Sequence, residues 1–143
     1  MKDCSNSVRT IYVNALNGNI TYNSRNVPVY GQPPFVTPPE QYAIITNITE
    51  TADNTNNSFS NIVEVTIEIY SEQNKNNNMG QVDSISNQIL NILIPDTQID
   101  GFDDADFEIF PMARTSSTYS PLWDGDNYLS RKILIIRNLV NQK

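Results

Sequence analysis

Carboxylates are the side chains with the clearest chemical potential in this sequence, and residues 100–108, DGFDDADFE, hold the densest run of them. Oxygen-rich loops of this kind can bind calcium. An EF-hand loop, however, needs carboxylates at alternate positions before a glycine, and this segment does not provide them. A solvated acidic surface is therefore the preferred interpretation of Asp103, Asp104 and Asp106, and we predict no metal site.

Residues for the common kinds of catalysis are missing. The sequence has no histidine, which excludes a Ser-His-Asp triad and a histidine proton shuttle. The single cysteine, Cys4, has no histidine base to activate it, and one cysteine supplies neither an internal disulfide nor a zinc site. All glycines are isolated, so there is no phosphate-binding loop. A small enzyme that uses paired carboxylates remains an alternative, but we expect no enzyme and no cofactor.

Two polar segments carry candidate contact residues. Aromatic side chains in loops are typical of residues that anchor a partner, and polar loops can become ordered on a neighbouring subunit. We therefore predict a subunit or partner interface at Asn54, Asn56, Asn57 and Phe59 in the first segment, and at Tyr119, Leu122 and Trp123 in the second. The alternative for Trp123 is that its ring folds back over the sheet.

Length and charge restrict the class of protein. The 143 residues suit one domain, 1–143, with a substantial core. The formal net charge is -7 and no cluster of basic residues occurs, so tight binding of nucleic acid is disfavoured. Membrane association is not expected either, because no apolar run approaches the ~18 residues of a membrane-spanning helix, and the N-terminus lacks the apolar segment of a signal peptide.

Strict alternation in residues 62–70 gives the clearest structural signal. Val63, Val65, Ile67 and Ile69 point to one side of a strand, and Glu64, Thr66 and Glu68 point to the other. The pattern predicts a sheet with one apolar and one polar face. Residues 133–136 are apolar at successive positions, which indicates a strand covered on both faces.

The remaining pattern supplies the elements around this strand. Apolar residues at helical spacing predict helices at 5–17 and 79–94, and the second helix is expected to pack on the apolar face of the sheet. We also predict a small hairpin over 20–30, a stiff proline-rich connector over 31–39, further strands at 42–48, 107–110 and 128–140, and a long connection over 112–127. The expected fold class is α+β: an antiparallel β-sheet with two helices packed on one face, a small β-hairpin and long polar loops.

This layout resembles the tail-completion or tail-terminator proteins of tailed bacteriophages, which act in the neck ring at the head-tail junction. It is a resemblance of element order over nearly the whole chain and not of a signature motif. The matching segments are the helices 8–16 and 82–93, the hairpin 20–30, and the strands 38–45, 63–69 and 132–140.

The resemblance implies a structural virion protein, assembled in the host cytoplasm and located in the neck or tail. It implies a homo-oligomeric ring of six or twelve subunits that joins the portal or head-side connector to the tail and lets DNA pass through its lumen. The acidic residues Glu64, Glu68, Asp103, Asp104 and Asp106 are then expected to face the lumen. The alternative is a calcium- or carbohydrate-binding β-rich module that uses Trp123 and the acidic segment.

Overall fold

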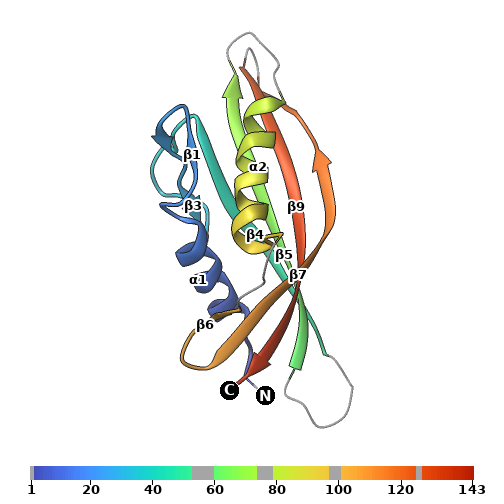
Figure 1. The fold of residues 1–143 in the computed structure, drawn as a ribbon. Coiled ribbons are helices and arrows are strands. Elements are labelled where there is room, and N and C mark those ends of the chain that lie inside the picture. The colour runs from blue at the N-terminus through green and yellow to red at the C-terminus, as the bar shows by residue number, and fades with distance from the viewer. Residues whose placement is uncertain (1, 53–59, 74–78, 97–100, 125–126) are drawn as a thin grey trace.

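A computed structural model describes residues 2–52, 60–73, 79–96, 101–124 and 127–143 (Figure 1). The predicted contact residues Asn54, Asn56, Asn57 and Phe59 lie outside the described residues. The elements in chain order are α1 (Ser5–Leu16), β1 (Thr21–Tyr22), β2 (Arg25–Asn26), β3 (Val29–Tyr30), β4 (Gln41–Ala52), β5 (Ser60–Gln73), α2 (Gly80–Leu93), β6 (Phe102–Asp103), β7 (Phe107–Tyr119), β8 (Leu122–Asp124) and β9 (Asn127–Gln142).

One large sheet organises the molecule, with strands in the order β3-β4-β5-β9-β7-β6 and β8 paired to β9. The four long strands β4, β5, β9 and β7 are antiparallel to their neighbours. The short strand β3 is parallel to β4, which makes the sheet mixed. The predicted hairpin is confirmed only in part: β1 and β2 form a separate two-stranded sheet around Asn23 and Ser24, both at positive φ.

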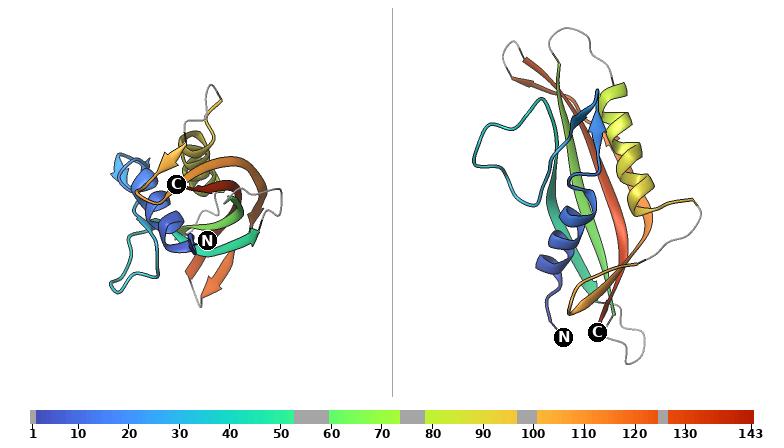
Figure 2. Two further views of the ribbon diagram at one scale, coloured as in Figure 1. Left: turned by 90° about the horizontal axis from the view of Figure 1, so that it is seen from below. Right: turned by 60° about the vertical axis from the view of Figure 1, so that its left-hand side comes forward.

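The sheet is strongly curved because its outer ladders contain irregularities. Register shifts occur between Ile45 and Asn47 in β4, and at two places in β7, one of them between Arg114 and Ser116. An extra residue on one strand bends it and increases the local twist. The turned views show the long strands curling into a half-barrel (Figure 2).

The predicted fold class is therefore wrong. Strands make up most of the regular structure, and the sheet is a curled, mixed half-barrel with two helices instead of an antiparallel sheet with helices on one face. Alternation identifies which residues share one side of a strand, but it contains no information on bulges or on the pairing of β3. The predicted connection 112–127 is also wrong, because β7 continues to Tyr119 and β8 follows it.

The core lies between the apolar side of β5 and the helices. Val63, Val65, Ile67 and Ile69 are all fully buried, as the alternation predicts. α2 contacts β5 and β9, whereas α1 contacts β4, β3 and β6. The helices contribute their own buried stripes, which include Val8, Tyr12 and Leu16 of α1 and Val82, Ile85, Ile89 and Leu93 of α2. Each such aliphatic side chain adds about 1.5–3 kcal/mol by leaving water.

A buried polar network fixes α1 to the central strands. The hydroxyl of Tyr12 donates to Asn138 Oδ1, and Asn138 Nδ2 donates to the carbonyl oxygens of Val63 and Ile136 at 3.1 and 3.0 Å. Both side chains are almost completely buried, and burial raises the pKa of Tyr12. Asn138 thereby links β9 to its neighbour β5 and to the helix packed above them.

We predict that Tyr12→Phe lowers the free energy of unfolding by about 1–3 kcal/mol, because the buried Asn138 oxygen loses its donor. Urea denaturation measures the change. Tyr22→Phe, which removes a hydroxyl from a half-buried ring, is the matched control and should change the free energy by less than about 0.5 kcal/mol. Equal losses for the two variants would contradict a structural role of the network.

Candidate interaction surfaces

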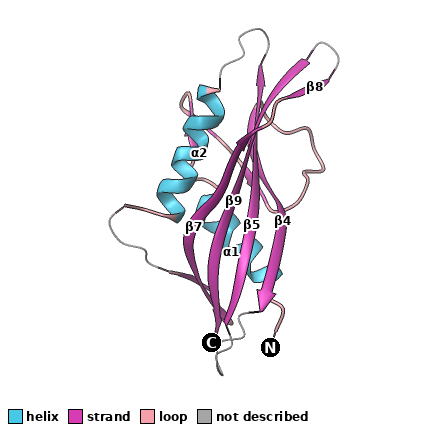
Figure 3. Ribbon diagram, turned by 90° about the vertical axis from the view of Figure 1, so that its right-hand side faces the viewer, coloured by secondary structure: helices cyan, strands magenta, loops and turns pink. Residues whose placement is uncertain are grey.

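The outer face of the sheet, the side of β5 that carries Glu64, Thr66 and Glu68, is the first candidate surface. No helix of the described residues lies over it (Figure 3). The predicted cover on both faces of residues 133–136 is therefore wrong: Leu134 and Ile136 are buried, but Ile133 and Ile135 are partly exposed. Partly exposed aliphatic groups on an uncovered sheet indicate a surface suited to contact.

The acidic residues of this face have compensating neighbours. Glu64 stands directly opposite Arg137 of β9 in the register. Glu68 Oε2 accepts a hydrogen bond of 2.6 Å from the Tyr70 hydroxyl, and Tyr70 is opposite Arg131. Burial, followed by the bond to Glu68, raises the pKa of Tyr70 to about 12. The outer face therefore carries Glu64, Glu68 and Glu72 beside Arg131 and Arg137, so its negative charge is offset in part.

Aromatic rings cross the outer face at the end where β4 begins. The rings of Tyr42 and Tyr70 are stacked with centroids 5.0 Å apart and an interplanar angle of 17°. Tyr30 of β3 lies 6.2 Å from Tyr42 in a tilted arrangement. Such pairs contribute about 0.5–1.5 kcal/mol beyond the area they bury. They fix the short strand β3, and the segment that follows it, to the edge of the sheet.

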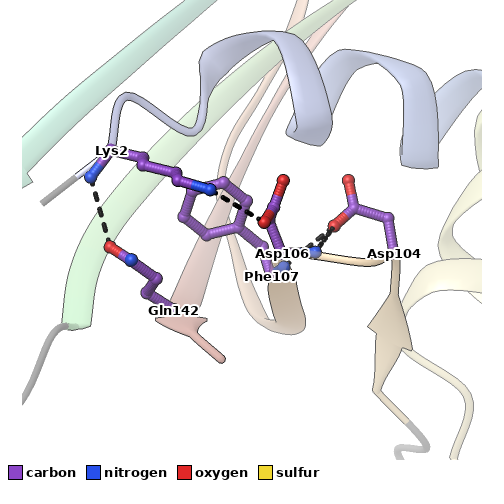
Figure 4. A network of polar contacts seen from close by, with 5 residues as sticks. All are labelled: Lys2, Asp104, Asp106, Phe107 and Gln142. Carbon is purple, nitrogen blue, oxygen red and sulfur yellow. Dashed lines mark hydrogen bonds and ion pairs between the residues drawn. The ribbon is translucent and has the colours of Figure 1, made fainter.

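The acidic turn between β6 and β7 is held by the two ends of the chain, and Figure 4 shows the contact made by Lys2. Lys2 Nζ lies 3.0 Å from Asp106 Oδ1, and Lys143 Nζ lies 2.7 Å from Asp103 Oδ2. Asp104 Oδ1 accepts the backbone N–H groups of Asp106 and Phe107, each at 2.8 Å. The carboxylates thus shape the turn and pair with lysines. Within the described residues, no group of acidic, histidine and cysteine side chains is arranged to hold a metal ion.

The structure divides the five acids that were predicted to face a lumen. Asp103, Asp104 and Asp106 gather on the acidic turn, whereas Glu64 and Glu68 belong to the outer face of β5. The alternation and the acidic run already separate the two groups along the sequence, but the lysine partners of Asp103 and Asp106 have no sequence signal because they lie at the two ends of the chain.

The hairpin formed by β8 and β9 presents the second candidate surface. Trp123 is 74% exposed, and its ring meets Tyr128 edge-on at a centroid distance of 4.7 Å. The hydroxyls of Tyr119 and Tyr128 share a hydrogen bond of 2.9 Å. The structure therefore brings the predicted residues Tyr119, Leu122 and Trp123 together at one end of the sheet. Tyr128 was missed, although its cross-strand partner is Trp123.

A third surface is the proline arm, residues 31–40, which connects β3 to β4. As predicted, this segment contains no helix or strand. Phe35 and Val36 are 96% and 73% exposed. Four prolines restrict the backbone, so little conformational entropy remains to be lost when such a segment binds. The sequence could have indicated this exposed apolar segment, because a Phe-Val pair lies between two pairs of prolines.

Two adjoining hollows separate the proline arm from α1. The arm hollow, about 440 Å³, is lined mainly by Val13, Val29, Tyr30, Pro33, Pro34 and Phe35. The Arg9 hollow, about 280 Å³, is lined by Arg9, Thr10, Val13, Asn14, Gly31 and Gln32. The Arg9 Nε atom is buried and has no hydrogen-bond partner among the described residues. A Cβ at Gly31 would lie only 3.0 Å from Arg9 Cγ, so glycine permits this close approach.

Cys4 is buried at the start of α1. Its Sγ donates to Glu50 Oε1 at 2.8 Å, and the same oxygen accepts the Cys4 backbone N–H at 2.9 Å. Burial, followed by the contact with Glu50, raises the pKa of the Cys4 thiol to about 12. The thiol is therefore neutral at physiological pH, which is the opposite of what a nucleophile needs.

Comparison with known proteins adds no assignment: no protein-family model matches the chain, and no curated protein is significantly similar to it. Within the described part of the chain, no helix is both long enough and apolar enough to cross a membrane.

We predict that Cys4 in the folded protein does not react with a disulfide reagent at pH 8 and that it reacts once the chain is denatured. Absorbance of the released thiolate measures both rates. Met112→Cys, which places a thiol where the native side chain is 48% exposed, is the control and should react in the folded state. Rapid labelling of folded Cys4 would contradict the buried contact with Glu50.

Proposed function

We propose that this protein is a structural subunit of a homo-oligomeric ring in the neck or tail of a tailed bacteriophage virion. It joins the portal or head-side connector to the tail, has no catalytic role and allows DNA to pass. The resemblance in element order supports this proposal, although the sheet is more curved than expected. The observation that carries it is the arrangement of the two open edges of the sheet.

Both edges of the four-stranded centre expose unpaired backbone among the described residues. On β4, only Ala43 and Ile44 pair with β3, which leaves the outer side of residues 45–52 open. On β7, only Glu108 and Ile109 pair with β6, which leaves residues 110–119 open. An open edge is a template for pairing with another chain, and monomeric proteins usually block or shorten it.

The directions of the strands favour a head-to-tail contact between identical copies. Each step from β4 to β5, β9 and β7 is antiparallel, so β4 and β7 run in opposite directions. A second copy in the same orientation can therefore place its β7 beside β4 and continue the antiparallel pairing of the sheet. Such a heterologous contact forms a ring if the rotation between copies closes. The curvature of the sheet provides a rotation at each step.

The charges on the surface are compatible with passage of DNA. If the outer face lines the lumen, Glu64, Glu68 and Glu72 outnumber the two arginines of that face, Arg131 and Arg137, so it has no excess of positive charge to retain phosphates. We propose that this face lies toward the lumen and that the acidic turn, with Asp103, Asp104 and Asp106, lies on a rim of the ring.

The carbohydrate-binding alternative has one observation in its favour, the exposed Trp123 ring beside Tyr128. Its calcium component is weaker, because Asp103 and Asp106 already pair with lysine ammonium groups. Calorimetry against a set of glycans, with and without calcium, separates the two functions. If one glycan releases heat on binding to the wild type and this heat disappears with Trp123→Ala, the result would favour the carbohydrate module.

Proline substitutions on β7 distinguish edge pairing from folding. The Ser120 N–H donates to Arg131 O at 2.8 Å, and the register from residue 116 to 119 is unbroken. Since N–H groups alternate between the two sides of an antiparallel strand, the N–H of Thr118 faces β9 and that of Ser117 faces the open edge.

We predict that Ser117→Pro keeps the fold but abolishes the oligomer, because proline removes a donor that a neighbouring copy would use. Thr118→Pro should instead lower the thermal unfolding temperature, because it removes a bond to β9. Ser117→Ala is the control for loss of the side chain. Native mass spectrometry reports the subunit number and circular dichroism reports the fold. An unchanged oligomer in folded Ser117→Pro would exclude pairing through this edge.

A further inference from the structure

We propose that Trp123 of one copy inserts into the arm hollow of the next copy in the ring. This inference rests on the head-to-tail pairing of β4 with β7 that is proposed above. Two exposed apolar features would then contact each other: the indole ring of Trp123 and the arm hollow beside the proline arm.

The register of the sheet places these features at the same end of opposite edges. Tyr42 of β4 is opposite Tyr70, Tyr70 is opposite Arg131, and Arg131 O accepts the N–H of Ser120. One row across four strands therefore runs from the end of the proline arm to the residues just before Trp123. In this register, residues 45–52 of β4 pair with β7 of the next copy as far as its Ser117. The chain beyond Ser117 must then pass along the outer side of β3, which occupies Ala43 and Ile44, and this path leads its Trp123 toward the proline arm.

The hollow suits an indole ring. Its walls are apolar or aromatic side chains, among them Val13, Tyr30 and Pro34, and its volume of about 440 Å³ lies within the range of small-ligand pockets. The Trp123 ring contacts Tyr128 only edge-on, so most of its surface is available. Tryptophan is enriched among the residues that contribute most to the affinity of protein interfaces.

Arg9 adds a polar element to the same place. Val13 and Gly31 line both hollows, so the Arg9 hollow opens directly beside the arm hollow. The Arg9 guanidinium is half-buried, and its Nε has no partner among the described residues. An aromatic face above a partly desolvated guanidinium is a favourable cation–π arrangement. The incoming ring therefore meets mostly apolar walls beside a guanidinium whose Nε atom has no hydrogen-bond partner among the described residues.

The contact is directional, which fits a ring. Each copy supplies one Trp123 and one arm hollow, and the two are different surfaces, so the contact is heterologous. The prolines of the arm keep the hollow formed before binding, which reduces the entropy lost on association.

Disulfide trapping between two single-cysteine variants tests the contact, with Cys4→Ser in every background. We expect Trp123→Cys mixed with Pro34→Cys to give a cross-linked dimer under mild oxidation. Met112→Cys mixed with Pro34→Cys is the matched control. Met112 is also exposed on this edge, but it lies near the opposite end of β7. A cross-link in the control that equals or exceeds the one at position 123 would overturn the proposal.

Trp123→Ala provides the second measurement, because this exposed side chain can be removed without opening the core. We expect its subunit affinity to fall by about tenfold or more. Met79→Ala, at the exposed N-cap of α2 and outside both open edges, should stay near wild type. If the wild-type ring forms and Trp123→Ala leaves its affinity unchanged, only this inference is lost. If the wild-type chain stays monomeric at every concentration, the ring proposal and this inference both fail.

Discussion

The unbroken pairing of β5 with β9 is the constraint on which the rest of the structure depends. This ladder runs from Ser60 opposite Asn141 to Gln73 opposite Tyr128 without a register shift, whereas the flanking ladders are interrupted. Because side chains alternate along both strands, the register places the aliphatic residues of one side of β5 on the face that the two helices cover. Asn138 adds a buried polar link between β9, β5 and α1. A slip by one residue would expose that core and bury Glu64 and Glu68.

The flanking strands convert this rigid centre into a surface for association. Irregularities in β4 and β7 bend the sheet into a half-barrel, so the two open edges do not lie in one plane. The even number of long antiparallel strands makes these edges run in opposite directions. The proline arm and the β8–β9 hairpin extend the edges at one end, and there they carry the most exposed aromatic side chains, Phe35 and Trp123. A single sheet thus supplies both halves of the proposed contact.

Sequence reasoning predicted the parts of the fold that depend on local periodicity. The alternation in β5 and the apolar stripe of α2 follow from side-chain spacing alone, and the structure confirms both elements. The curl, the parallel pairing of β3 and the length of β7 depend on non-local pairing. The polar residues Ser116, Ser117 and Thr118 resemble a loop, although they pair with β9. Among the candidate residues, the cluster of Tyr119, Leu122 and Trp123 was predictable, whereas the arm hollow joins residues of α1, β3 and the proline arm.

Electron cryo-microscopy of the purified, assembled protein would locate each strand relative to the neighbouring copy. We expect a closed ring around a central opening in which residues 45–52 of β4 pair antiparallel with β7 of the next subunit. A monomer, or a two-fold dimer in which both sheet edges remain open, would contradict it.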